Sequence, residues 1–239
     1  MKKNRLDNEI TARRLLPAGE NPKAYIMAGE VLVDGQVEYR PDRKTGPDNI
    51  IEIKKKRPYV SRGALKIEKA FADFAVGIPG KKFLDVGIST GGFSDYVLKG
   101  GAEAVVGIDV NIDQVDYNLR RDKRLKLIKG NARYLKKEDV GIEPDIIIID
   151  VSFISVTKIL PALTVFPQAK IIALIKPQFE AAKKEVGRGG VIKETKIAAA
   201  VLSRLEKQIE RIGFSVLGKT PAGVKGRKGN QEYFFLLGK

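Results

Sequence analysis

The sequence predicts an α/β protein, with a mostly parallel, helix-covered sheet that has an antiparallel pair at one edge and follows a small α+β module. From Tyr59 onward, short apolar runs alternate with helical stretches, as in sheets with helices on their faces. The runs are continuously apolar, which is typical of parallel strands buried on both faces. The last two runs are joined without a helix, which indicates the antiparallel edge pair.

The N-terminal module begins with two predicted helices, Leu6–Leu16 and Pro22–Ala28, with a break between them at Pro17–Asn21. Glu30–Tyr39 is a predicted hairpin, because apolar residues alternate around an Asp-Gly turn. A polar loop, a short strand and a basic linker are then predicted at Arg40–Asn49, Ile50–Ile53 and Lys54–Pro58. We place the domains at 1–55 and 61–239, with a linker at 56–60. A module of this size buries little core, so we expect it to dock on a nucleic acid or on its neighbour.

The larger part is predicted to hold five parallel strands, at Lys82–Val86, Ala104–Asp109, Leu125–Lys129, Asp145–Asp150 and Ile171–Ile175. Helices are predicted between them, at 93–100, 112–122, 134–139 and 155–163. A long helical stretch, Lys193–Ile212, precedes the two edge strands, which we expect at Phe214–Lys219 and Glu232–Leu237.

The composition excludes several kinds of chemistry. The 239 residues include no Cys and no His, which excludes a disulfide framework, a thiolate nucleophile, an imidazole base and a Cys or His metal site. No apolar run approaches the ~20 residues that cross a bilayer. The first residues are basic but lack the apolar core of a signal peptide. We therefore expect a cytoplasmic protein with no membrane partner and no bound metal.

The net charge of +15 favours a polyanionic partner, most often nucleic acid. Residues 1–60 hold 13 basic and 9 acidic residues, 61–150 hold 15 and 14, and 151–239 hold 16 and 6. The excess of positive charge therefore lies mainly in the last third of the chain. A single Lys there is ordinary solvated surface, but the glycine-laced basic loops around 183–188 and 225–228 can together follow a phosphate backbone.

A glycine-rich turn follows the first strand of the larger part, and the next strand ends on an acid, Asp109. Ligands of such sheets bind at the carboxyl ends of the central strands, where glycines let the backbone approach. The spacing is not GxGxxG and lacks the Lys of a phosphate loop, whereas an acid at Asp109 can accept both ribose hydroxyl protons. The pair fits S-adenosylmethionine, and the alternative is a tight turn with a helix-capping Asp. The predicted cofactor-binding residues are Asp85, Gly87, Ser89, Thr90, Gly91, Gly92, Phe93, Asp109 and Asn131.

The residues after the fourth strand limit which chemical group can accept the methyl. Asp150-Val151-Ser152-Phe153 lacks the Pro-Pro that amino-group methyltransferases usually have at this place, and methylation of a cytosine carbon needs a Cys. A hydroxyl or a purine ring position remains. The fifth strand runs into Lys176, which is costly to bury without an acid to pair with or a reaction to serve.

Four charged residues are expected at this edge of the sheet, namely Lys66, Asp150, Lys176 and Glu232. Each alone is readily a structural salt-bridge partner, but the four at these elements favour a catalytic set. A ribose 2'-hydroxyl must lose its proton as it attacks, and a lysine can accept that proton only when neutral. A second ammonium and partial desolvation both favour the neutral form.

The sequence resembles known families in both parts. Arg5–Asp7 and Lys23–Gly35 resemble the S-four RNA-binding fold, which a ribosomal protein shares with pseudouridine synthases. The larger part resembles the TlyA family of bacterial rRNA 2'-O-methyltransferases, also named haemolysin A and related to FtsJ-type methyltransferases. The segments that carry this resemblance are 57–66, 85–93, 150–155, 176–180 and 229–234.

The resemblance implies an S-four module joined to a class I methyltransferase domain that binds S-adenosylmethionine. The family's catalytic Lys-Asp-Lys-Glu tetrad corresponds to the four charged residues above, its cofactor loop to Gly87–Phe93, and its interdomain linker to Arg57–Val60. Members methylate cytidine ribose in rRNA, with an intact small or large ribosomal subunit as the target. The candidate RNA-binding residues are Arg5, Arg13, Arg14, Lys23, Arg62, Lys183, Lys184, Arg188, Arg227 and Lys228.

The sequence also allows two functions other than the enzyme. A non-catalytic RNA-binding protein could retain the fold, but the complete tetrad argues against it. A membrane-active haemolysin, as the second family name suggests, would need a long apolar or strongly amphipathic segment, which the sequence lacks. The proton acceptor within the tetrad stays open.

Overall fold

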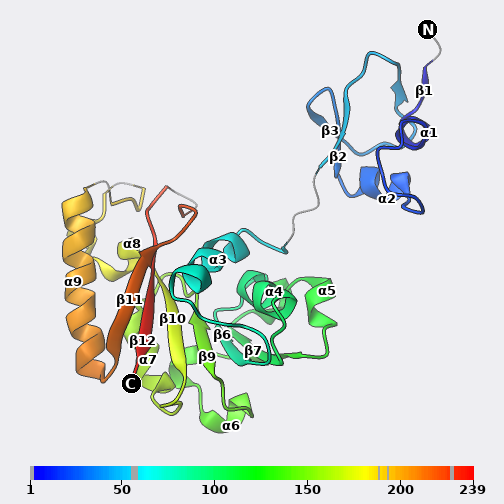
Figure 1. Ribbon diagram of the computed structural model, residues 1–239. Helices are drawn as coiled ribbons and strands as arrows, with labels where there is room; N and C mark the ends of the chain where they lie inside the picture. The colour runs from blue at the N-terminus through cyan, green and yellow to red at the C-terminus, as the bar shows by residue number, and fades with distance from the viewer. Residues whose placement is uncertain (1–2, 55–58, 188, 193, 227–228) are drawn as a thin grey trace. The chain divides into compact units, whose positions relative to one another are not determined.

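The computed structural model describes residues 3–54, 59–187, 189–192, 194–226 and 229–239. The chain divides into two compact units, Met1–Pro58 and Tyr59–Lys239, and each is described by itself (Figure 1).

The first unit is a three-stranded antiparallel sheet with two short helices. Its helices are α1 (Leu6–Ala12) and α2 (Pro22–Met27), and its sheet has the order β3-β2-β5, from Gln36–Glu38, Val31–Val33 and Ile51–Ile53. The predicted hairpin is confirmed, because β2 pairs with β3 through a turn in which Asp34 and Gly35 both have positive φ. Leu6, Ile10 and Ile26 are fully buried and form its small core with the strands.

Two features of this unit differ from the sequence prediction. Helix α1 ends at Ala12 rather than at Leu16, because Arg14 takes a left-handed conformation with φ 53°. The loop predicted at 40–49 contains the two-residue strand β4 (Lys44–Thr45), which pairs with β1 (Asn4–Arg5). Neither strand is long enough to show an alternating apolar pattern, so the pattern could not reveal them.

The second unit contains a seven-stranded sheet with the order β11-β12-β10-β9-β6-β7-β8. Its parallel strands are β6 (Lys82–Val86), β7 (Ala104–Asp109), β8 (Leu125–Lys129), β9 (Ile146–Ile149) and β10 (Lys170–Ile175). The strand β12 (Tyr233–Gly238) is antiparallel to both of its neighbours, β10 and β11 (Ser215–Pro221). The predicted mostly parallel sheet with an antiparallel edge pair is thus confirmed.

Each face of this sheet has its own apolar core. Ile147 and Ile149 of β9 pack with the cluster that includes residues of α9 (Thr195–Ile212). Ile146 and Ile148 pack on the other face, with the cluster formed by α3 (Gly63–Asp73) and α4 (Gly92–Lys99). Helix α9 lies on one side of the sheet and α3 and α4 on the other (Figure 1). Because successive side chains point to opposite faces, a strand buried on both sides reads as a continuous apolar run.

Three predicted helices are instead pairs of short turns. The segments are η1 (Ile112–Gln114) with α5 (Tyr117–Arg120), η2 (Ala132–Tyr134) with α6 (Lys137–Val140), and η3 (Val156–Lys158) with α7 (Leu160–Leu163). Side chains of Asn111, Asp116, Asn131 and Ser155 accept backbone N–H groups at the starts of four of these turns. Such caps start a new turn rather than continue a helix. Two further turns, α8 (Pro177–Glu180) and η4 (Lys183–Glu185), were not predicted.

Within the described ranges, none of the helices combines the length and the apolar character that crossing a membrane requires.

Candidate active site

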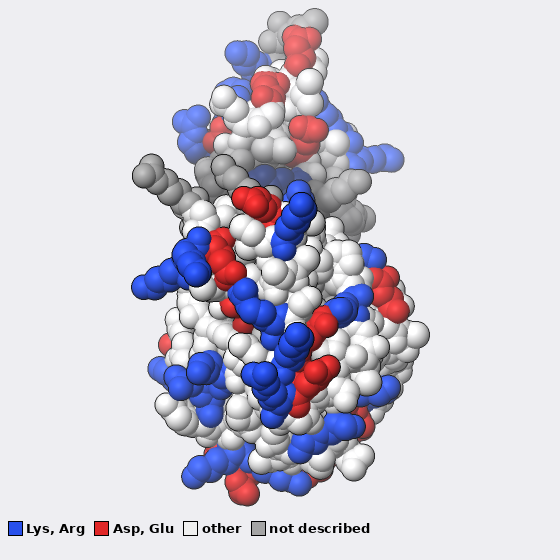
Figure 2. All heavy atoms as spheres, turned by 90° about the vertical axis from the view of Figure 1, so that its left-hand side faces the viewer, with Lys and Arg blue, Asp and Glu red and all other residues white. Residues whose placement is uncertain are grey.

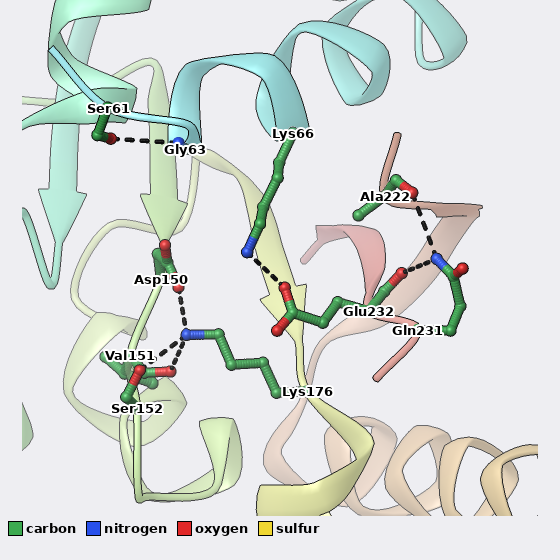
Figure 3. A network of polar contacts seen from close by, with 10 residues as sticks. All are labelled: Ser61, Gly63, Lys66, Asp150, Val151, Ser152, Lys176, Ala222, Gln231 and Glu232. Carbon is green, nitrogen blue, oxygen red and sulfur yellow. Dashed lines mark hydrogen bonds and ion pairs between the residues drawn. The ribbon is translucent and has the colours of Figure 1, made fainter. Parts of the chain in front are cut away.

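The sheet topology brings the four predicted catalytic residues to one edge. Asp150 directly follows β9 and Lys176 directly follows β10. Glu232 directly precedes β12 rather than beginning it, and because β12 runs antiparallel to β10, its start lies at the same edge. Lys66 comes from the first turns of α3. Figure 3 shows the side chains from these three strand ends and the helix converging on a common space.

The four side chains form two ion pairs. The ammonium of Lys176 lies 2.5 Å from Asp150 Oδ1, and that of Lys66 lies 2.6 Å from Glu232 Oε2. The side chains of Lys66 and Asp150 keep 15% and 27% of their exposure, whereas Lys176 and Glu232 are buried. Each buried charge thus has an opposite charge in contact, which offsets much of its desolvation cost. The more exposed member of each pair remains accessible to a substrate.

Lys176 has three oxygen partners. Besides Asp150, its ammonium donates to the carbonyl of Val151 at 3.1 Å and to the hydroxyl of Ser152 at 2.9 Å (Figure 3). Two of its three N–H groups are thus used in hydrogen bonds, and the contact with Asp150 is an ion pair. The segment after β9 therefore fixes the position of the Lys176 nitrogen.

The predicted cofactor loop is shaped by two glycines. Gly87 has φ +86°, and a Cβ there would lie 2.7 Å from the backbone oxygen of Asp150. Gly91 has φ +94°, and a Cβ there would lie 2.1 Å from Cδ2 of Leu119. No other residue fits either place without moving its neighbour. Gly91 caps α4, so the loop ends at the N-terminus of that helix, with Phe93 buried behind it against Phe234.

Asp109 closes the loop from the neighbouring strand. Its Oδ2 accepts from the backbone N–H of Ser89 at 2.9 Å, and its Oδ1 accepts from that of Asn111 at 3.0 Å. Each oxygen keeps a further lone pair, and the residue remains only half-buried. The carboxylate is therefore held in place while still able to accept hydrogen bonds from a diol.

Two adjoining pockets lie along this loop. The larger, of about 430 Å³, is lined by residues that include Asp109, Asn131, Ser152 and Phe153. The smaller, of about 240 Å³, is lined by residues that include Ser61, Arg62, Lys66 and Asp85. Gly87, Ser89 and Asp150 line both. The two are thus parts of one cleft, with the tetrad's Asp150 where they meet, and Thr90, Gly92 and Phe93 also face the smaller part.

Asp85 is the most strongly perturbed of the predicted cofactor residues. Burial raises its pKa to about 7, and the negative charges of Asp150 and Asp109 add to this effect. Oδ2 accepts a hydrogen bond from the hydroxyl of Ser94 at 2.7 Å, but Oδ1 is buried without a hydrogen-bond partner. A buried acceptor without a donor next to a polar pocket is suited to a ligand that brings its own N–H groups.

These features fit S-adenosylmethionine. The amino-acid ammonium can supply the missing donor to Asp85, and the ribose hydroxyls can donate to Asp109. The larger pocket, which is lined by the polar Asn131 and the apolar Ile108 and Ile159, suits an adenine ring.

The described candidate RNA-binding residues differ in their surroundings within each unit. In the first unit Arg5 is paired with Asp7 at 2.8 Å, and Arg13 is bound to Glu9 and to the carbonyls of Gly46 and Asn49. Arg13 thus ties α1 to a loop of its own unit, whereas Arg14 and Lys23 are exposed.

In the second unit Arg62 lines the smaller pocket, and Lys183 and Lys184 are exposed on η4. Arg188, Arg227, Lys228 and most of the linker at 54–58 lie outside the described residues. On the face that carries α9, Lys and Arg interleave with acids (Figure 2). Two of these basic residues are paired, Arg204 with Glu185 and Lys219 with Glu206. The excess of positive charge in residues 151–239 is therefore partly balanced by acidic residues on that face.

Sequence reasoning missed several residues that line the cleft. Ser61 lies so close to the cofactor loop that a Cβ on Gly92 would lie 2.0 Å from its hydroxyl oxygen. Ser152 contacts Lys176, and Phe153 is 90% exposed beside Phe179, with ring centroids 5.1 Å apart. Phe153 also has φ 64°, a strained conformation for a bulky residue. The Asp150-Val151-Ser152-Phe153 segment marks this place in the sequence, but the spacing of its residues does not reveal the contacts of Ser152 and Phe153.

Comparison with known proteins gives the family. The FtsJ-like methyltransferase family matches residues 59–239. The chain is 35% identical to the 16S/23S rRNA (cytidine-2'-O)-methyltransferase TlyA of Mycobacterium tuberculosis, over 98% of this chain and 89% of that protein. The chain belongs to the TlyA family of FtsJ-like methyltransferases. It is therefore a methyltransferase whose cofactor is S-adenosylmethionine, as the sequence predicted.

Solved structures agree with this family membership. A protein described as a hemolysin, from Streptococcus thermophilus, is 35% identical with a TM-score of 0.73, and the match covers 100% of this chain and 89% of that one. An S-adenosylmethionine-dependent methyltransferase from Mesorhizobium loti, at 14% identity, shares the fold with a TM-score of 0.51 over 72% of this chain and 96% of that one. The predicted class I methyltransferase fold of this TlyA-family chain is thus confirmed.

The state of Asp85 predicts a pH-dependent cofactor affinity. With a pKa of about 7 in the free protein, Asp85 is mostly protonated below that pH, and it must ionise to pair with an ammonium. We expect the affinity for S-adenosylmethionine to fall about fivefold between pH 7 and pH 6, with proton release on binding, and to level off above pH 8. Calorimetry in buffers of different ionisation enthalpy measures both. Asp85→Asn should bind with no such pH dependence, and an equal slope in both proteins would contradict the assignment.

Proposed function

We propose that this TlyA-family protein transfers the methyl group of S-adenosylmethionine to a ribose 2'-hydroxyl, that of a cytidine in ribosomal RNA within a ribosomal subunit. The observation that carries the proposal is the pair of lysine–carboxylate contacts at the mouth of the cofactor cleft. A chain without Cys or His has few other groups for activating a hydroxyl. Lys66 lines the smaller pocket, and Lys176 contacts Asp150, which lines both pockets.

The four residues of the tetrad have different roles in the reaction. The cofactor supplies an electrophilic methyl group on a sulfonium. Asp150 and Glu232 hold the two lysines, and either lysine in its neutral form can take the 2'-hydroxyl proton as the oxygen attacks in line. Lys176 is the more precisely positioned of the two lysines, because its nitrogen contacts three oxygen atoms. Lys66 has one partner among the described residues, the carboxylate of Glu232. The remaining ammonium then offsets negative charge on the attacking oxygen.

Ribosomal RNA is the favoured substrate for three reasons. The Mycobacterium tuberculosis relative carries 16S/23S rRNA cytidine in its name. The net charge of +15 suits a polyanion. Phe153, 90% exposed at the rim of the larger pocket, offers an aromatic face on which an unstacked base can lie.

The domain assignment is part of the same proposal. We propose that residues 1–55 are an S-four-type RNA-binding domain, that 56–60 are the linker, and that 61–239 are the catalytic domain, in a cytoplasmic protein that meets its substrate there. Two short helices on a small antiparallel sheet support this, together with the exposed Arg14 and Lys23. The intact subunit is favoured over free RNA because a separate RNA-binding domain can recognise a folded site away from the target ribose.

Methyl transfer to purified particles tests the proposed function. Small subunits, large subunits and protein-free rRNA are incubated with the enzyme and radiolabelled S-adenosylmethionine. We expect incorporation into at least one intact subunit, and at least about tenfold less into the corresponding naked rRNA. Absence of transfer to all three would contradict the proposed function, and equal transfer to naked rRNA would contradict the role of the subunit.

A further inference from the structure

We propose that the hydroxyl of Ser152 carries the substrate proton to Lys176, so that Ser152 is a proton-relay residue of the site. This rests on the proposed function above and deepens it, because it names how the 2'-hydroxyl reaches a lysine that is buried. This serine is not one of the four residues of the tetrad.

Burial of Lys176 is the first step of the argument. The residue is 8% exposed, whereas Ser152 is exposed and lines the larger pocket. The Ser152 oxygen lies 2.9 Å from the Lys176 nitrogen. Figure 3 shows Ser152 and Val151 on one side of that nitrogen and Asp150 on another. Ser152 is thus an exposed residue whose hydroxyl is hydrogen-bonded to a nitrogen that the protein covers.

The three oxygen partners of Lys176 are not equivalent. The carboxylate of Asp150 and the carbonyl of Val151 can only accept hydrogen bonds, whereas a serine hydroxyl can also donate. A neutral lysine has two N–H groups and one lone pair. In that form the N–H groups can be directed to the two pure acceptors, Val151 in a hydrogen bond and Asp150 in close contact, and the lone pair is then left for the one partner that carries a proton. The serine is therefore the partner that suits the basic form of Lys176.

The proton transfer balances with the groups present at the site. The 2'-oxygen gives its proton to Ser152 Oγ as the Ser152 hydroxyl proton passes to the lone pair of Lys176. The electron pair left on the 2'-oxygen forms the new bond to the methyl carbon, and the carbon–sulfur bond breaks with its electrons going to sulfur. The lysine ends as an ammonium, the sulfonium as a neutral thioether, and the serine is unchanged.

The backbone around Ser152 supports a fixed position for its hydroxyl. Asp150 is held by its backbone N–H to the carbonyl of Val86, and Val151 by its carbonyl to Lys176. On the other side, the next residue, Phe153, adopts φ 64°. Strain of this kind persists where the surroundings over-determine the conformation. The hydroxyl thus lies between two constrained residues rather than on a free loop.

Three variants test the relay in single-turnover methyl transfer to the rRNA substrate that the wild type accepts. At saturating S-adenosylmethionine and RNA, Ser152→Ala should lower the rate about 100-fold, because the relay proton is missing, while both affinities stay within a few-fold of the wild type. Ser152→Thr restores a hydroxyl and should recover most of the rate. Ser155→Ala is the matched control, since this serine of the same segment bonds to Glu180 and Thr157 and not to Lys176, and its rate should stay within about threefold.

Mixtures of light and heavy water separate a relay from a merely structural serine. The wild-type rate should depend on deuterium content along a curve, as when two protons move together, and that of Ser152→Ala along a straight line. A wild-type rate in Ser152→Ala, failure of Ser152→Thr to recover, or an equal loss in Ser155→Ala would each overturn the relay while leaving the function intact. A wild type inactive on every rRNA substrate would instead overturn the proposed function.

Discussion

Replacement of Lys176 by alanine is expected to lower methyl transfer at least about 1000-fold while S-adenosylmethionine still binds within a few-fold of the wild-type affinity. The reason is that Lys176 contributes its nitrogen to the reacting edge but does not line either cofactor pocket. Loss of a general base typically costs 10²–10⁴-fold in rate. Asp150, which keeps 27% side-chain exposure, can be solvated by water when its partner is gone, so the fold should survive.

The measurement is single-turnover transfer together with calorimetric cofactor binding. Lys170→Ala is the matched control, because Lys170 begins the same strand and is exposed at its other end. Its rate should equal that of the wild type. Full activity of Lys176→Ala would refute its role as base and leave Lys66 as the proton acceptor. Loss of cofactor binding in the same variant would show that Lys176 has a structural role.

Replacement of Asp109 by alanine is expected to weaken S-adenosylmethionine binding about 10- to 100-fold. A carboxylate that accepts from ribose hydroxyls makes charge-assisted hydrogen bonds worth about 1.5–3 kcal/mol. The change also removes the acceptor that holds the N–H of Ser89, so the glycine loop loses one of its anchors. Because the maximal rate at saturating cofactor depends on the tetrad rather than on Asp109, it should fall far less than the affinity.

Titration calorimetry with S-adenosylmethionine measures this effect. Asp113→Ala serves as the control, since Asp113 lies four residues further along, exposed on η1, and lines neither cofactor pocket. Wild-type affinity in Asp109→Ala would show that the ribose does not contact this acid and that the glycine loop binds the cofactor in another orientation.

Most strands of the larger unit were predictable because a strand buried on both faces is a run of consecutive apolar residues in the sequence. The strands β6, β7 and β8 have the predicted bounds, although β8 is less buried than its neighbours. The segments after β7, β8 and β9 were less predictable, because their apolar spacing suits a helix while Asn111, Asp116 and Asn131 restart the chain in short turns. Periodicity reports which side chains are buried, but it does not report where a side-chain oxygen replaces a backbone acceptor.

In the candidate site, too, one part could be predicted from the sequence and another part could not. The convergence of Asp150, Lys176 and Glu232 follows from strand order, because two parallel strands end and an antiparallel strand begins at one edge. The pairing within the set could not be predicted, since it depends on side-chain directions.

For Arg13 the sequence does not predict the partners that the structure shows. We expected this arginine to contact RNA, but it donates to Glu9 and to two carbonyls of its own unit. Sequence gives the charge of such a residue, but only the packing around it shows which partners that charge meets.

Identification of the methylated nucleoside tests the central claim most directly. Subunit rRNA methylated by the purified protein is digested completely, and the nucleosides are separated by mass spectrometry, with the Lys176→Ala protein treated in parallel. We predict one new product that carries the methyl group on the ribose of cytidine and is absent from the variant. A methyl group on a base, or the same product from both proteins, would contradict the account of a lysine-dependent 2'-hydroxyl methyltransferase.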